Sequence, residues 1–248
     1  MDYDFYLERA INIFNQRMGT GFSKDKLVLT CFITEDQEEI FEQFCSKYFP
    51  YRLNDRYHED GYFDFRASSF VGMDNGGIDG ILLRTDISYQ PDELLHIFLH
   101  ELAHLFCVHN ELDGRSFFEE YCVGYATTKE EDGIINAGYA VWRECIAEII
   151  AVELDDCCDI VPLKDKKDAL SKFRNEIEQV DGKLLVSEIL AAVMTGSEVE
   201  TAKSWSDAEK AISKLGLFTD PPEMDLFRLV YAQLRTTFVE IDVDFIHE

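Results

Sequence analysis

The apolar positions of this chain follow a helical spacing in some segments and a strand-like pattern in others. Residues 3–18 predict a helix, because apolar side chains recur every three to four positions and glycines follow the last of them. Residues 26–33 are β-branched and aromatic enough to predict a strand. Residues 34–49 predict a second helix, in which Thr34 is the N-cap and acidic residues occupy the first turn.

The pattern changes at about residue 51 to short runs separated by glycine and Asx residues. Asn75-Gly76 predicts the turn of a hairpin. Its second strand contains residues 81–85 and lies immediately before a long apolar run. Pro91 and the two acidic residues after it predict the start of a helix, which we expect to extend over residues 91–109.

A second apolar helix is predicted over residues 139–154, and the chain beyond Pro162 is helical in pattern. The later helices are expected at about residues 164–179, 183–194, 207–215 and 222–240. We therefore expect an α+β protein with a small mixed sheet and two central helices. The predicted division is a domain over residues 1–160 and a helical C-terminal part over residues 161–248 packed on the same core. The alternative is a single domain.

The composition narrows the possible partners. The net charge of −26 and the pI near 4.4 argue against binding to nucleic acid or to an anionic membrane surface. Hydrophobic residues make up 46% of the chain, which is typical of a globular protein. No apolar run approaches the length of a membrane span.

The seven cysteines form no CxxC pair and their number is odd, which favours a reducing compartment over a disulfide framework. The N-terminal residues lack the basic region and the apolar run of a signal peptide. The predicted location is the cytoplasm.

The long apolar run contains the residues with the clearest chemistry. His100 and His104 are four positions apart, so both lie on one face of the predicted helix and can share a metal ion. Glu101 beside the first histidine is placed to act as a general base on a water held by that ion. Residues 100–104 thus have the HExxH pattern.

A catalytic zinc ion needs a third protein ligand and an open position for water. A histidine six positions after His104 would supply it in the metzincin arrangement, but that position is Asn110. A glutamate on a later helix is the other common solution. Glu144 fits it, because Glu144 and Glu148 are four apart in an apolar helix and need a cation or donors nearby. Other carboxylates that can supply the third ligand are Glu111, Glu119 and Glu120.

HExxH followed by a helix with Glu-x-x-x-Glu resembles the gluzincin, or thermolysin-like, branch of the zincin metallopeptidases over residues 80–155. The resemblance implies that His100, His104 and Glu144 bind Zn²⁺. It also implies that Glu101 is the general base and that Glu148 orients a ligand histidine from the second shell. The spacing from His104 to Glu144 is longer than in thermolysin-like enzymes. Small intracellular zincins of the phage-regulator type also combine His-Glu-Leu-x-His with a glutamate on a later helix.

The function that this resemblance implies is a zinc-dependent metallopeptidase that hydrolyses a peptide or protein substrate. The strand over residues 81–85 would resemble the zincin edge strand, along which a substrate peptide lies extended. The alternative is a non-catalytic zincin-fold binding or regulatory protein with a structural metal site. A purely structural site has no use for Glu101, which favours the enzyme.

Other polar residues near the motif have less defined roles. An oxyanion donor is expected, and the candidates are Tyr121, Tyr125, Tyr139 and His109. His96 shares the histidine face but fits no ligand pattern, so we expect it in the core or in the second shell. His58, His109 and His247 are interpreted as surface or loop histidines.

Overall fold

The computed structural model describes residues 1–59, 61–72 and 77–113. It also describes single residues further along the chain, which are Arg115, Glu119, Gly124, Thr128, Asn136, Tyr139, Arg143, Glu144, Ile146, Ala147, Ile150, Ala151, Leu154 and Asp155. The chain divides into two compact units, and the first contains Met1–Leu105 and Ile150–Lys166. The three strands, and the helices up to residue 105, belong to the first unit.

Helix α1 (Tyr3–Met18) is the helix predicted near the N-terminus. The backbone N–H of Phe5 donates to the side chain of Asp2, which is the N-cap. Gly19 ends the helix with a φ of 62°, and its N–H donates to the carbonyl of Asn15 at 3.0 Å. A glycine adopts this left-handed conformation without the steric cost of a side chain.

Three strands form one mixed sheet in the order β1-β3-β2. β1 (Leu27–Phe32) pairs in parallel with β3 (Asp79–Arg84), and β2 (Ala67–Phe70) pairs antiparallel with the other side of β3. The antiparallel pair confirms the predicted hairpin strands, while Asn75-Gly76 lies outside the described residues. The prediction that the strand before the motif helix is an edge strand is wrong. Because β3 is hydrogen-bonded on both sides, a peptide cannot add to it.

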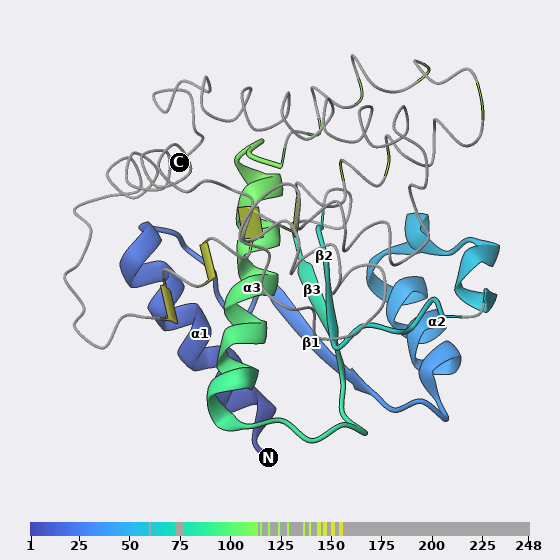
Figure 1. Ribbon diagram of the computed structural model, residues 1–248, viewed down its shortest axis with the longest axis horizontal. Coiled ribbons are helices and arrows are strands. Elements are labelled where there is room, and N and C mark those ends of the chain that lie inside the picture. Colours follow the sequence, from blue (N-terminus) through green and yellow to red (C-terminus); the bar gives the residue numbers. More distant parts are fainter. Residues whose placement is uncertain are drawn as a thin grey trace, which may run out of the picture. The chain divides into compact units, whose positions relative to one another are not determined.

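The helices cover both faces of this sheet (Figure 1). α1 and α3 (Pro91–His109) lie on one face, and α2 (Gln37–Tyr48) lies on the other. On the α2 face, Phe70 and Leu82 join an aromatic cluster with Phe41 and Phe44. The backbone of Gly80 approaches this cluster so closely that a Cβ at residue 80 would lie 2.6 Å from the ring of Phe44.

The start of α2 differs from the prediction. The N-cap is Asp36 and the helix begins at Gln37, so Thr34 does not cap it. The hydroxyl of Thr34 instead donates to Asp86 and accepts from Arg84 at 2.7 Å. The Thr34 side chain thus contacts a charged pair at the end of the neighbouring strand, because the ends of β1 and β3 lie side by side.

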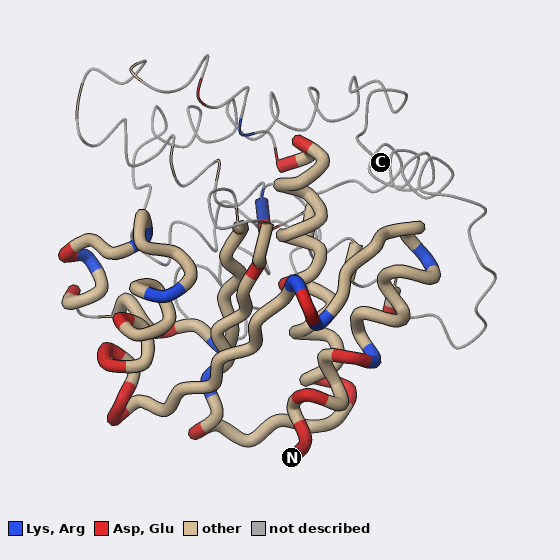
Figure 2. The backbone as a smooth tube through the Cα atoms, turned by 180° about the vertical axis from the view of Figure 1, so that it is seen from behind, with Lys and Arg blue, Asp and Glu red and all other residues tan. Residues whose placement is uncertain are grey.

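The described elements confirm an α+β protein with a small mixed sheet. The predicted boundary near residue 160 and the later helices lie outside the described residues. Within the part that the structure describes, no helix is both long enough and apolar enough to cross a membrane. Acidic residues occur in the first turns of α1 and α2 (Figure 2), and Asp4, Glu38 and Glu39 are exposed.

Candidate metal centre

Helix α3 has the bounds predicted from the sequence, and its start is fixed by side chains. Pro91 occupies the first helical position, where no backbone donor is needed. The N–H of Gln90 donates to the carboxylate of Glu93 at 3.2 Å, which satisfies a donor at the start of the helix. Glu93 also forms an ion pair with Arg66, which precedes β2. These contacts anchor the helix directly after β3.

The middle of α3 is buried on nearly every side. Its apolar core includes Phe98, Leu99, Leu102 and Ala103, each with no exposed surface. Glu101 and His104 are also buried, with 6% and 7% of their surface exposed. Ionisable groups are rarely buried without partners, because the loss of hydration costs free energy.

His100 and His104 face each other across one turn of α3. Their Nε2 atoms lie 3.1 Å apart, and the ring planes are inclined at 81°. Two imidazole nitrogens bound tetrahedrally to one zinc ion, each at about 2.0–2.1 Å, would be roughly 3.3 Å apart. The pair is therefore close to the geometry that a shared ion requires.

Glu144 is the described carboxylate that joins this pair. One ligand atom from each of His100, His104 and Glu144 lies within 4.8 Å of the other two. The chemistry of this set, two imidazoles and one carboxylate, suits a divalent transition metal. Among the described residues no other group of three candidate ligands meets this criterion.

The other carboxylates considered for this role lie elsewhere or are not described. Glu111 is exposed and has a φ of 57° just after α3. Glu119 is exposed and accepts a hydrogen bond from Arg115 Nε at 2.7 Å. Glu120, and Glu148 as the predicted second-shell residue, lie outside the described residues.

Asn110 directly follows α3, and its hydrogen bonds close the end of the helix. Asn110 is buried, and its side-chain amide donates to the carbonyl of Phe106 at 2.7 Å. The N–H of Leu112 donates to the carbonyl of Cys107 at 2.8 Å. These bonds satisfy carbonyls that the last turn of a helix leaves without a partner.

Two candidate oxyanion donors are described. His109 is exposed at the last position of α3. Tyr139 donates its hydroxyl to Asp113 Oδ2 at 3.2 Å, and burial together with the charge of Asp113 raises the pKa of Tyr139. Its hydroxyl is thus used in a contact with a buried carboxylate. Tyr121 and Tyr125 lie outside the described residues.

One contact of α3 was not expected from the sequence. His96 Nδ1 lies 3.2 Å from Asp155 Oδ2, and the two side chains are 27% and 35% exposed. His96 is one turn before His100, and Asp155 is 59 positions further along the chain. No local pattern connects residues so far apart, so the sequence carries no signal for this pair.

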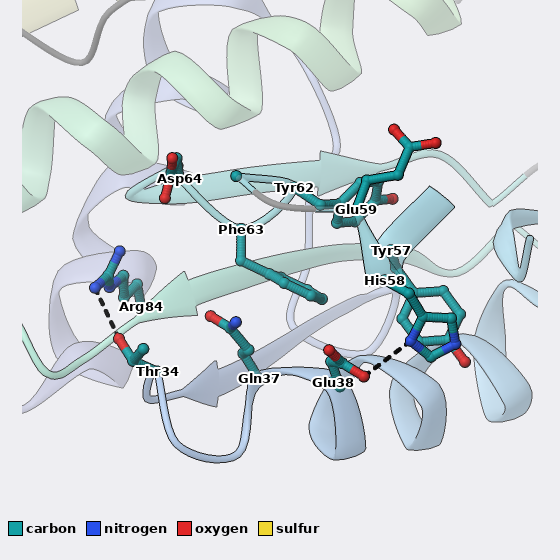
Figure 3. Close-up of a pocket in the computed structure, with 11 residues that line it drawn as sticks. Thr34, Gln37, Glu38, Tyr57, His58, Glu59, Tyr62, Phe63, Asp64 and Arg84 are labelled. Carbon is teal, nitrogen blue, oxygen red and sulfur yellow. Dashed lines mark hydrogen bonds and ion pairs between the residues drawn. The ribbon is translucent and has the colours of Figure 1, made fainter. Parts of the chain in front are cut away.

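A hollow on the α2 side of the sheet contains none of the predicted site residues (Figure 3). Phe63 lies at its centre, between Arg84 with Thr34 on one side and Glu38 with His58 on the other. His58 Nδ1 is 2.9 Å from Glu38, and Arg84 is hydrogen-bonded to Asp86 and Thr34. Glu38 and His58 are thus paired within the hollow, whereas Arg84 pairs with Asp86 beside it. As predicted, His58 is a surface histidine.

Comparisons with known proteins do not identify a family for this chain. No family model, no curated protein and no solved structure matches the chain. The function is therefore argued from the residues and their geometry alone.

Proposed function

We propose that the protein is a zinc-dependent metallopeptidase in which His100, His104 and Glu144 bind the metal and Glu101 is the general base. The observation that supports this proposal best is the gathering of the three ligand atoms within 4.8 Å. Two nitrogens and one oxygen leave a fourth tetrahedral position for water, as catalytic zinc sites require.

Glu101 fits a base rather than a ligand, because it lies beside the three-ligand group and not within it. It follows His100 on α3 and is buried. A bound zinc ion polarises a substrate carbonyl and lowers the pKa of its water. Glu101 would accept the proton that the water loses as it attacks the carbonyl carbon. It would then deliver this proton to the nitrogen of the leaving amine when the C–N bond breaks.

The site-bearing helix also follows directly from the sheet. β3 ends at Arg84 and α3 begins at Pro91, which gives the strand-then-helix order expected of a zincin core. The substrate would not pair with β3, since both of its edges are occupied. A peptide or protein substrate would therefore bind without adding to β3.

Metal analysis of the purified full-length chain tests the site. We expect about one zinc ion per chain, as for a three-ligand catalytic site, and much less in His100→Ala. Less than half a zinc ion in the wild type, equal to that in His100→Ala, would refute the metal site. Iron in place of zinc would refute the peptidase, because two histidines and a carboxylate also suit non-haem iron.

A second variant separates catalysis from metal binding. Glu101→Gln should keep its zinc but cleave a mixed peptide library about 10²–10⁴-fold more slowly than the wild type. The matched control is Asp92→Asn, which changes an exposed carboxylate in the first turn of the same helix. A variant as active as the wild type would remove Glu101 as the base. Bound zinc with no cleavage by the wild type would favour a structural metal site in a binding or regulatory protein.

A further inference from the structure

The hollow on the α2 side of the sheet is formed by described residues of the first compact unit alone (Figure 3). They belong to the start of α2, to the turns between α2 and β2, and to the end of β3. The hollow has a volume of about 180 Å³. Sites that hold a drug-sized ligand have about 300–1,000 Å³. The hollow therefore suits a single side chain of a partner better than a whole cofactor.

The aromatic wall of the hollow is fixed by the core beneath it. Phe63 is only 5% exposed, and its ring centroid lies 5.0 Å from that of Tyr62 and 5.5 Å from that of Phe41. The ring centroid of Tyr57 lies 5.3 Å from that of Phe41, and the Tyr57 hydroxyl donates to Glu42. Because these rings are already held in place, little conformational freedom is lost when a ligand packs against them.

The charges that line the hollow leave one carboxylate without a close partner. The other charged residues of the lining are paired, in the contacts Glu38–His58, Glu59–Arg56 and Arg84–Asp86. Asp64 is exposed and forms no ion pair with a described residue. A turn at Gly61, which has a φ of 81°, holds Asp64 at the hollow, since the Asp64 N–H donates to the carbonyl of Gly61 at 3.1 Å. The hollow therefore favours a ligand with one positive charge.

Gln37 adds a polar group that the fold does not use. Its side chain is partly buried, and its amide points towards Phe63 (Figure 3). It forms no hydrogen bond with a described residue. Partly buried amides are satisfied by protein, water or ligand, so Gln37 can bind water in the free protein and offer its oxygen to a donor on a ligand.

We propose that the hollow binds the guanidinium group of an arginine side chain on a peptide or protein partner. A guanidinium is a planar cation that can lie on an aromatic ring while its N–H groups donate to oxygens at the rim. Asp64 and Gln37 supply such oxygens. The net charge of −26 favours the approach of a basic partner. The proposal does not depend on the metal site, because the hollow lies on the α2 face and α3 lies on the opposite face.

The test titrates the full-length, ¹⁵N-labelled chain with the tripeptide acetyl-Gly-Arg-Gly-amide and follows the Gln37 side-chain amide by NMR. The signal is identified by its absence from Gln37→Ala. We expect it to shift with the arginine peptide. The same peptide with citrulline in place of arginine should not shift it, because citrulline has nearly the same shape but no charge. This comparison uses the wild-type chain and does not depend on how a variant folds.

A variant tests the carboxylate. Asp64→Asn should weaken binding of the arginine peptide by about tenfold, as the loss of a charged hydrogen-bond partner does. Asp25→Asn is the matched control, because it removes an exposed carboxylate outside the hollow, and it should leave the affinity unchanged. Unchanged thermal unfolding temperatures verify that both variants are folded.

Three outcomes would overturn the proposal. Equal shifts with the arginine and citrulline peptides would show that the charge is not recognised. Equal losses in Asp64→Asn and Asp25→Asn would show that the peptide senses only the general acidity of the chain. Tighter binding of spermidine, a polyamine without a guanidinium, would assign the hollow to free amines instead. None of these outcomes bears on the proposed peptidase, which the zinc and cleavage measurements test separately.

Discussion

The two helices on opposite faces of the sheet, α2 and α3, differ in how far their polar side chains are exposed to solvent. α2 buries only the stripe formed by Phe41, Phe44 and Cys45, and its acidic residues are exposed. α3 buries most of its middle, including Glu101 and His104. Polar residues on α2 need no explanation beyond solvation, whereas those on α3 are costly to bury.

The polar contacts on the two sides differ accordingly. On α2, Gln43 donates to Glu39 at 3.0 Å and Glu38 pairs with His58, all at exposed positions. Exposed pairs of this kind contribute at most about 1 kcal/mol each. On α3, two imidazoles meet in a partly buried setting with a carboxylate nearby. The contrast indicates that the polar residues of α2 are solvated surface residues, whereas those of α3 form the candidate functional site.

The largest expected effect is the loss of stabilisation by zinc when a buried histidine of α3 is replaced by an apolar residue. This variant makes α3 more like α2. His104→Leu should not respond to zinc, while the wild type should gain about 2.7 kcal/mol of unfolding free energy at a zinc concentration 100 times the dissociation constant. Without metal, the variant should be about as stable as the wild type, since an apolar side chain suits the buried position. Urea unfolding with and without zinc measures both.

The control for that variant is His58→Leu, which changes an exposed histidine on the α2 side. It should retain the full response to zinc. Equal stabilisation of His104→Leu and the wild type by zinc would show that the metal binds elsewhere.

A smaller effect, a loss of stability without loss of zinc, is expected from a substitution that disturbs only the packing on the α2 face of the sheet. Gly80→Ala should lower the unfolding free energy by about 1–3 kcal/mol, because its Cβ would overlap the rings of Phe44 and Phe49. Zinc stoichiometry should not change, since residue 80 faces α2. Gly21→Ala is the control, because nothing lies within 4 Å of a Cβ there. A loss of zinc in Gly80→Ala would mean that the two faces are coupled.

The smallest effect concerns the charged contact at the ends of β1 and β3. Hydrogen bonds from Arg84 and then Thr34 lower the pKa of Asp86. The stabilisation is therefore complete above the unfolded pKa of about 4 and is lost as the pH falls through the lower folded value. Asp86→Asn should unfold slightly more easily at pH 7 and show a weaker decline in stability below pH 4. Parallel curves for variant and wild type, measured by thermal unfolding, would contradict this.

Local patterns predicted the elements well. The bounds of α3 follow from Pro91 at the start and the end of the apolar run at His109. Local patterns do not predict the strand order, because the pairing of β1 with β3 joins residues about fifty positions apart. The expectation of an edge strand was wrong for that reason. Thr34 was misassigned because its partner Asp86 is equally distant in sequence.

In the candidate site, too, local spacing predicts some contacts and not others. The spacing of His100 and His104 within one helix is enough to predict that their rings meet. Adding Glu144 to them required an argument about buried charge, and metal binding by the three residues remains a prediction for experiment. The pairing of His96 with Asp155 depends on how two distant segments pack, which no spacing rule contains.

The parallel pairing of β1 with β3 also has a consequence for folding kinetics. Leu27 pairs with Asp79, so the chain must close a loop of about fifty residues before β3 has its second neighbour. Such non-local contacts slow folding, whereas helices and hairpins form early. α3 can become helical on its own, but the sheet against which it packs is complete only after this closure. The histidine pair therefore acquires its buried environment late in folding.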